Sequence, residues 1–249
     1  GIALVVELVD GVTLQCYVLQ PPMPHMVFRF SAVHGVSCAL KYLHSRRVVH
    51  GDVKGGNVMV EFQGNTTRAK MLDFGLSHKL SGKPKPMGGT LAWMAPEVYK
   101  FPSRAPKPSS DVFSFGRLLY FTLTGTMPYP NNSKRQLRHM LRTHLLPTLT
   151  LPGQHPVEAH LADLLDNCLR VNEEQRPSMQ TVQKTLLDAA VEFDDKAPTV
   201  NLALLLPDAT RTDTGLHVRS AQLNVPGPGR AATQHTVNQS SALVTSADT

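Results

Sequence analysis

Two short segments bring together carboxylate, ammonium and amide groups along the chain. Residues 50–57 read HGDVKGGN, and Asp73 opens a second segment, DFG. A carboxylate such as Asp52 can orient an attacking hydroxyl and accept its proton, and the Lys54 ammonium can lie against a phosphate as a point charge. The side-chain oxygens of Asn57 and Asp73 are ligands that magnesium prefers. These groups suit phosphoryl transfer, in which the protein mainly positions the reactants and neutralises charge.

The alternative is a loop whose polar side chains merely satisfy one another, and an isolated His-x-Asp motif would favour it. The two segments together, however, resemble the H-x-D-x-K-x-x-N catalytic loop and the D-F-G tripeptide of the protein kinases. Residues 89–97, GTLAWMAPE, resemble the end of a kinase activation segment, and residues 111–116, DVFSFG, resemble the helix that follows it. All four motifs occur in the order that the family has them.

The resemblance implies a role for each of these residues, with ATP and Mg²⁺ as cofactors. Asp52 would be the catalytic acid/base residue, Lys54 the phosphate contact, and Asn57 and Asp73 the metal ligands. Thr90 matches the threonine that bridges the catalytic aspartate and lysine in serine/threonine kinases. The sequence WMAPE resembles the tyrosine-kinase-like group, most of whose members phosphorylate serine or threonine. The expected partner is therefore a protein substrate with a serine or threonine hydroxyl.

The apolar run at residues 2–9 predicts a buried strand, closed by the Asp-Gly turn that follows it. In the kinase family this would be the last strand of the small lobe, entering the hinge. The resemblance then assigns Val6 to the back of the adenine pocket, the backbone of Glu7 and Val9 to hydrogen bonds with adenine, and Met59 to the floor of the site. The same residues are compatible with an ordinary core strand.

A glycine-rich phosphate loop, a strand lysine and its partner helix glutamate, which kinases carry ahead of the hinge, have no match in this chain. The fold class expected is α+β, a protein kinase-like, mainly helical large lobe with short β-hairpins and with the N-terminal small lobe mostly missing. We expect residues 1–13 to form the last small-lobe strand and hinge, and residues 14–193 the large lobe. Residues 194–249 have a low-complexity composition that predicts a disordered tail.

The elements that would position the motifs follow from periodicity and from turn residues. Residues 112–124 are apolar nearly all round, so this helix must be buried on all sides; a start at residues 109–111 and an end at Gly125 are expected. The other expected elements are a short helix at 14–19, an amphipathic helix from Phe30 to the catalytic loop, strands at 48–49 and 58–60, a hairpin turn at 63–65, and helices at 134–145, around 161–169 and at 176–191.

One position departs from the family pattern. Gly51 stands where kinases commonly have an arginine that grips a phosphate on the activation segment. Without that arginine, activity should not depend on a phosphate at Ser77 or Ser81. The resemblance also pairs Arg176 with Glu97 of the activation segment.

Composition sets broader limits. The 249 residues carry a net charge of +6, but the basic residues are scattered without interleaved aromatics, which argues against nucleic-acid binding. Three cysteines without paired or metal-ligand spacing predict reduced core thiols and a cytoplasmic location, with membrane attachment through residues outside this chain left open. No run approaches the length of a membrane helix. The sequence gives no indication of the oligomeric state.

Two other functions compete with protein phosphorylation. A pseudokinase-like interaction module would keep the fold without turnover, but it would have no need for Asp52, Asn57 and Asp73 together. A small-molecule phosphotransferase of related fold would share the paired acids, but it would not need the peptide-docking segment at residues 89–97.

Overall fold

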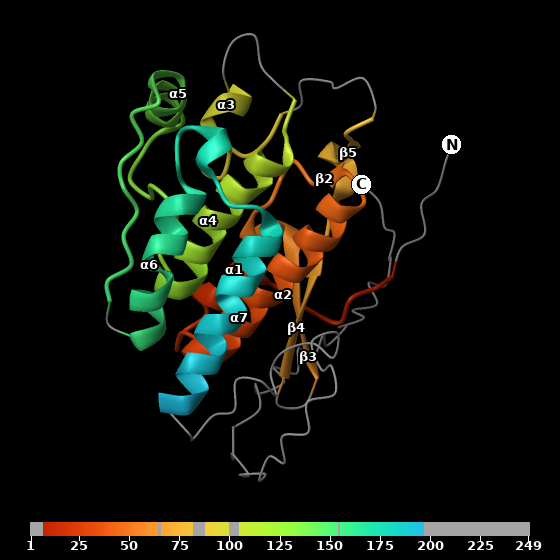
Figure 1. Cartoon of the computed structure of the whole chain (residues 1–249), viewed down its shortest axis with the longest axis vertical. Coiled ribbons are helices and arrows are strands. Elements are labelled where there is room, and N and C mark those ends of the chain that lie inside the picture. Colours follow the sequence, from red (N-terminus) through yellow and green to blue (C-terminus); the bar gives the residue numbers. More distant parts are fainter. Residues whose placement is uncertain (1–6, 64–65, 82–87, 100–104, 154, 197–249) are drawn as a thin grey trace, which may run out of the picture. The chain divides into compact units, whose positions relative to one another are not determined.

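The structure is a computed structural model, and it describes residues 7–63, 66–81, 88–99, 105–153 and 155–196. Helices form most of this part of the chain, and short antiparallel strands form the rest of its regular structure (Figure 1). In chain order the elements are β1 (Gly11–Thr13), α1 (Leu14–Leu19), α2 (Met26–Ser45), β2 (Val48–Val49), η1 (Gly55–Asn57), β3 (Val58–Gln63), β4 (Thr66–Met71), η2 (Phe74–Leu76), β5 (His78–Lys79), α3 (Pro96–Tyr99), α4 (Pro108–Thr124), α5 (Lys134–Thr143), α6 (Pro156–Cys168), η3 (Glu173–Gln175) and α7 (Met179–Lys196).

Four helices enclose the main hydrophobic core. Helix α2 contacts α4 and α7, and α6 contacts the same two helices, so the four lie together as a bundle (Figure 1). Their facing sides bury Phe30, Leu40, Phe115, Leu161 and Leu186 in one cluster. Each such side chain stabilises the fold by about 1.5–3 kcal/mol when it leaves water, so this bundle fixes the elements that carry the polar loops.

Helix α4 runs through the middle of the bundle, as its apolar composition predicts. From residue 110 to residue 123 every residue except Tyr120 is buried. The helix begins at Pro108, one residue earlier than expected, because proline suits a first turn and the Ser110 hydroxyl accepts a hydrogen bond from Lys107 N at 3.1 Å. Gly125 ends it in the left-handed region with φ of +71°, as expected.

The strands form two small antiparallel sheets. One has the order β1-β3-β4, with Thr13 opposite Met59 and Val58 opposite Met71, and the other pairs β2 with β5. Strand β4 packs against α2. The β3–β4 hairpin is therefore confirmed, although residues 64 and 65 of its predicted turn lie outside the described residues.

The predicted strand at residues 2–9 is not formed in its described part. Residues 7–10 belong to no strand, and residues 1–6 lie outside the described residues. The Leu8 side chain is 95% exposed, and the exposed Glu7 carboxylate pairs with Lys70 Nζ at 2.7 Å. Aliphatic composition alone suggested a buried strand here, but these side chains do not enter a core.

Other helix boundaries differ from those that the sequence periodicity predicts. Helix α2 begins at Met26 rather than Phe30, with His25 as its N-cap. Helix α7 begins at Met179 rather than Arg176 and continues to Lys196, three residues into the range expected as a tail; residues 197–249 lie outside the described part of the chain. The three cysteines are free, and Cys16 is exposed, so it is not the core residue that was expected.

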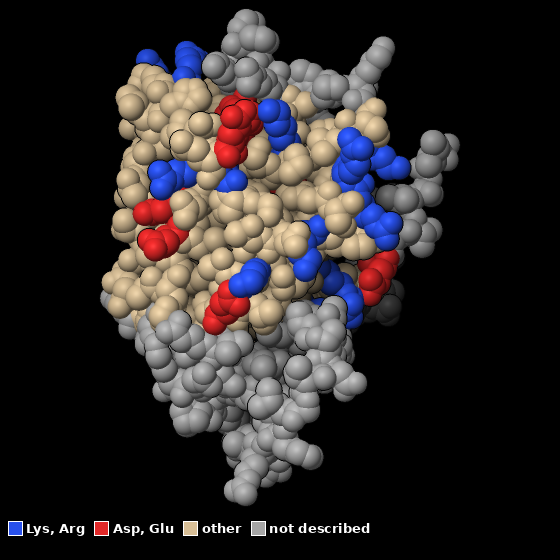
Figure 2. All heavy atoms as spheres, viewed as in Figure 1, with Lys and Arg blue, Asp and Glu red and all other residues tan. Residues whose placement is uncertain are grey.

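The surface carries both signs of charge. On the face drawn in Figure 2, Lys and Arg side chains gather over the C-terminal half of α2, and acidic side chains lie beside basic ones at several points. Exposed ion pairs include Lys107–Glu173 at 2.7 Å and Lys184–Asp188 at 2.8 Å, and such pairs contribute little stability. Within the described ranges, no helix has both the length and the apolar composition needed to cross a bilayer.

Candidate active site

The loop that carries Asp52 is anchored on helix α4 by a buried carboxylate. Asp111 Oδ2 accepts a hydrogen bond from His50 N at 2.8 Å, and its Oδ1 accepts one from Gly51 N at 2.9 Å. The same carboxylate lies 2.9 Å from His44 Nε2, near the end of α2. Two backbone amides and one imidazole therefore compensate the charge of the buried Asp111 carboxylate.

Three of the predicted site residues converge on the Asp52 carboxylate. Lys54 Nζ lies 2.5 Å from Asp52 Oδ2, and Asn57 Nδ2 donates to the same oxygen at 3.1 Å. Thr90 donates to Asp52 Oδ1 from its hydroxyl at 3.1 Å and from its amide at 3.2 Å. The Thr90 hydroxyl also accepts a hydrogen bond from Lys54 Nζ at 2.9 Å. Thr90 thus contacts both Asp52 and Lys54, the geometry that the resemblance implies for it.

Asn57 directly precedes β3, and Asp73 follows β4, the strand paired with it. Leu72 N donates to Asn57 O at 2.8 Å, which places the residue before Asp73 against Asn57. Asp73 is exposed in the left-handed region with φ of +58°, and its Oδ1 accepts a hydrogen bond from Gly75 N at 3.1 Å. Asn57 directs its amide nitrogen at Asp52, which leaves its side-chain oxygen free of that contact. This oxygen and the Asp73 carboxylate are of the donor type that a hard cation prefers.

Protein side chains alone do not form a closed metal cage here. In the described part of the chain, no group of three or more His, Cys, Asp and Glu side chains is placed to hold a metal ion. A magnesium ion bound by Asn57 and Asp73 would complete its shell with water and phosphate oxygens, which is how this ion is usually held beside phosphates.

The residues expected around adenine are only partly placed. Val6 lies outside the described residues. Glu7 is exposed, and Val9 is half-buried in a segment without regular structure. Met59 is half-buried in β3, between Thr13 of β1 and Lys70 of β4. The described residues therefore place Met59 on the central strand of the β1-β3-β4 sheet but do not bring a complete adenine pocket together.

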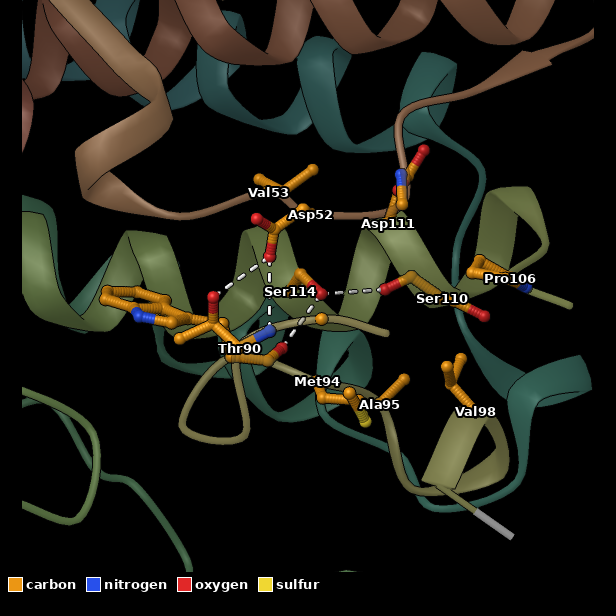
Figure 3. A pocket seen from close by; sticks show the side chains of 13 residues that line it. Asp52, Val53, Thr90, Met94, Ala95, Val98, Pro106, Ser110, Asp111 and Ser114 are labelled. Carbon is orange, nitrogen blue, oxygen red and sulfur yellow. Dashed lines mark hydrogen bonds between the residues drawn. The ribbon is translucent and has the colours of Figure 1, made fainter. Parts of the chain in front are cut away.

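A small pocket adjoins Asp52 (Figure 3). Asp52, Thr90, Met94, Ala95 and Val98 are among the residues that line it, and in Figure 3 two hydrogen bonds link Thr90 to Asp52. The floor of the pocket comes from α4. The pocket thus joins the catalytic-loop carboxylate to the segment expected to dock a peptide.

The expected Arg176–Glu97 pair is confirmed and is buried. Arg176 Nη1 and Nη2 lie 2.7 Å and 2.8 Å from the two Glu97 carboxylate oxygens, and the Ser110 hydroxyl donates to the same carboxylate at 2.9 Å. Burial acts to raise the pKa of Glu97, but the hydrogen bonds and charge of Arg176 outweigh it and leave that pKa below its usual value. The remaining Arg176 donors bond to the carbonyls of Ser109, Arg170 and Val171.

The backbone conformation at position 51 requires a glycine. Its φ is +82°, and a Cβ at this position would lie 2.8 Å from the Leu76 carbonyl oxygen. A residue with a side chain would be strained there for both reasons. The half-buried Ser77 hydroxyl meanwhile donates to His50 O at 2.9 Å.

Sequence reasoning missed one polar residue in this region. Arg117 lies in α4 at 1% exposure, and its Nη1 donates to backbone carbonyls of residues 91, 92 and 94. The available signal was an arginine in an apolar helix, three residues after Ser114 and six after Asp111.

Comparisons with known proteins agree with this geometry. The sequence matches the family model for the protein kinase domain over residues 1–187. It is 28% identical over 231 residues to the Raf homolog serine/threonine-protein kinase of Caenorhabditis elegans, which covers 87% of this chain and 26% of that protein. It is 34% identical over 155 residues to a putative mitogen-activated protein kinase kinase kinase 7-like protein of Drosophila melanogaster, covering 59% of this chain and 38% of the relative.

A third relative extends the comparison. The chain is 30% identical over 169 residues to serine/threonine-protein kinase PAK 1 of Mus musculus, covering 66% of this chain and 30% of that protein. The chain thus spans well under half the length of each of these relatives. Because the family model covers 187 of the 249 residues and serine/threonine kinases are among the relatives, the chain belongs to the protein kinase domain family.

Proposed function

We propose that this chain supplies the catalytic large lobe of a serine/threonine protein kinase, formed by residues 14–193. The observation that carries the proposal is the Asp52 carboxylate, which is contacted by Lys54, Asn57 and Thr90. A loop that only satisfied its own polar groups would not need a threonine that contacts both the acid and the lysine. The serine/threonine kinases among the relatives support the same activity.

Asp52 would orient the substrate hydroxyl and accept its proton as the oxygen attacks the terminal phosphorus of ATP. The new bond joins the substrate oxygen to phosphorus, and the bond between that phosphorus and the ADP oxygen breaks. Lys54 would lie against the transferring phosphoryl group and reduce its negative charge. Thr90 would keep Asp52 and Lys54 at a fixed separation, since its hydroxyl contacts both.

Kinases in general use ATP and a divalent metal ion. We propose Asn57 and Asp73 as the magnesium ligands; bound there, the ion would neutralise charge on the phosphate oxygens. Asn57 would present its oxygen because its nitrogen donates to Asp52. For adenine we propose Val6, the backbone of Glu7 and Val9, and Met59, of which Met59 lies in β3.

The direct test is transfer of labelled terminal phosphate from ATP to a peptide. A serine- or threonine-containing peptide should be labelled, and a matched peptide with alanine at the acceptor position should not. Nucleotide binding without transfer would favour the pseudokinase alternative. Label in small alcohols but not in peptides would favour a small-molecule phosphotransferase. Either outcome would overturn the proposal.

Replacing Thr90 by valine is expected to lower kcat by about tenfold or more, since a charge-assisted hydrogen bond is worth roughly 1.5–3 kcal/mol. The valine keeps the shape and the backbone N–H that contacts Asp52, but it loses the hydroxyl that contacts Asp52 and Lys54. Thr90→Ser keeps that hydroxyl and serves as the matched control. Steady-state kinetics would distinguish the two variants. A wild-type kcat in Thr90→Val would show that catalysis does not need the Thr90 hydroxyl as a bridge.

Replacing both Ser77 and Ser81 by alanine is expected to change activity by no more than about twofold, the scale of a neutral substitution. Gly51 has no side chain with which to bind a phosphate on the activation segment, and the Ser77 hydroxyl is already bonded to His50 O. The measurement is the peptide-phosphorylation rate of the double variant. Complete loss of activity would contradict this prediction.

A further inference from the structure

The largest fully buried side chain in the described residues is a charged one. Arg117 is 1% exposed in the middle of α4, between core residues on either side. Its Nη1 donates to Ala92 O at 2.9 Å, Met94 O at 3.2 Å and Leu91 O at 3.4 Å. One guanidinium nitrogen therefore binds three carbonyls of a single backbone turn.

The surroundings hold the guanidinium in place without an acidic partner among the described side chains that contact it. Its Cζ lies 4.6 Å from the centre of the Phe113 ring and 5.0 Å from that of Tyr129, so aromatic faces stabilise the cation. Burial lowers the pKa of Arg117 to about 10, which leaves the group charged at neutral pH. Burying a charge costs free energy that an apolar side chain of similar volume would avoid, so core packing alone does not explain an arginine here.

The turn bound by Arg117 is the one that carries Thr90. Trp93 N and Met94 N both donate to Thr90 O, at 2.8 Å and 3.0 Å. The Ser114 hydroxyl donates to Trp93 O at 2.8 Å, one helical turn before Arg117 (Figure 3). Arg117 and Ser114 thus fix the side of the turn that faces α4, while Thr90, Met94 and Ala95 line the pocket beside Asp52.

We propose that Arg117 is a positioning residue for the protein substrate, fixing the turn at residues 90–94 so that the pocket lined by Thr90, Met94 and Ala95 keeps its place relative to Asp52. This inference rests on the proposed kinase function. Arg117 does not touch the reacting atoms and acts through the backbone that it binds. Within the described residues, the hydrogen-bond and ring partners of Arg117 are residues 91, 92, 94, 113 and 129, and none of them is a residue proposed for adenine. We therefore expect its influence to fall on the peptide rather than on the nucleotide.

The test compares Arg117→Met with Arg29→Met. Arg29 is a second buried arginine, 5% exposed, whose Nη1 donates to the carbonyls of Thr122 and Leu123 at the far end of α4. Both variants remove a buried cation bound to carbonyls, but only Arg117 binds the turn at residues 90–94. Arg29→Met therefore matches the loss of stability without the proposed effect on docking.

In steady-state kinetics, Arg117→Met is expected to raise KM for a peptide substrate about tenfold or more, the change that matches loss of one charge-assisted hydrogen bond, and to leave KM for ATP unchanged. A purely destabilising change would lower the folded fraction and hence the apparent kcat, with both KM values unaltered. Arg117→Lys, which keeps a cationic donor, should recover part of the peptide KM. An unchanged peptide KM in Arg117→Met, or an equal rise in Arg29→Met, would overturn the inference.

A second readout does not depend on turnover. Hydrogen exchange at the amides of Trp93 and Met94 should accelerate in Arg117→Met and stay at the wild-type rate in Arg29→Met. If the chain transferred no phosphate, the proposed function would fail while this measurement still tested the positioning role. Unchanged exchange at both amides, with the fold retained, would exclude it. If Arg117→Met does not fold, the same exchange comparison is made between Arg117→Leu, which also removes every donor, and wild type, and equal rates would again exclude the role.

Discussion

Replacing Asp73 by asparagine is expected to lower magnesium-dependent phosphoryl transfer by at least about a thousandfold, because a metal ion contributes several kcal/mol of charge stabilisation in the transition state. The substitution removes one carboxylate charge and changes the volume little. Asparagine tolerates the left-handed conformation at φ of +58°, and its oxygen can still accept the hydrogen bond from Gly75 N. The fold should therefore survive while the proposed magnesium ligand is lost.

The measurement is peptide phosphorylation as a function of magnesium concentration, together with the melting temperature. Asp163→Asn is a matched control, because it makes the same chemical change at an exposed position on α6. The control should behave as wild type in both assays. If Asp73→Asn kept wild-type activity across the magnesium titration, the metal assignment would be wrong.

Replacing Arg176 by methionine is expected to lower the free energy of unfolding by about 3–5 kcal/mol, the usual effect of removing one partner of a buried ion pair. Glu97 would stay buried with only the Ser110 hydroxyl as a side-chain donor, and three carbonyls would lose theirs. Urea unfolding of Arg176→Met, Glu97→Gln and the double variant gives the coupling between the two residues. If the effects of the two single substitutions on the free energy of unfolding add up to that of the double variant, Arg176 and Glu97 are not energetically coupled.

The same pair sets a pH dependence of stability. The Glu97 pKa is lowered in the folded protein, so the unfolded chain binds the proton more readily. The contribution of Glu97 is therefore full above its ordinary pKa of 4.5 and is lost as pH falls below that value toward the folded pKa. In Arg176→Met this part of the acid slope should disappear. An unchanged slope would mean that other carboxylates dominate it.

Much of the site could be predicted from sequence because its signals are local. The catalytic-loop and DFG segments lie within 26 residues of each other in a fixed order, and the helix at α4 shows its burial through its composition. Asp52, Lys54, Asn57 and Thr90 do converge, and Arg176 does pair with Glu97. These partners are side chains, so their residue types and spacing can be recognised in the sequence.

The features that could not be predicted depend on backbone atoms or on tertiary packing. Arg117 binds carbonyls of residues 91, 92 and 94, and any residue supplies a carbonyl, so no sequence pattern marks its partners. The segment at residues 2–9 has strand-like composition, yet Leu8 within it is exposed. Composition shows that a segment can be buried, but only the packed fold decides whether it is.

Helix α4 also sets the spacing between two segments that bind to it. Asp111 binds the loop that carries Asp52, and Ser114 and Arg117 bind the turn at residues 90–94. At a rise of 1.5 Å per residue, the first and last of these anchors are about 9 Å apart along the axis. A rigid displacement of α4 would carry the loop and the turn together and preserve their spacing, whereas a bend between Asp111 and Arg117 would change it. The proposed alignment of ATP and peptide therefore depends on the straightness of two helical turns rather than on where the helix lies in the bundle.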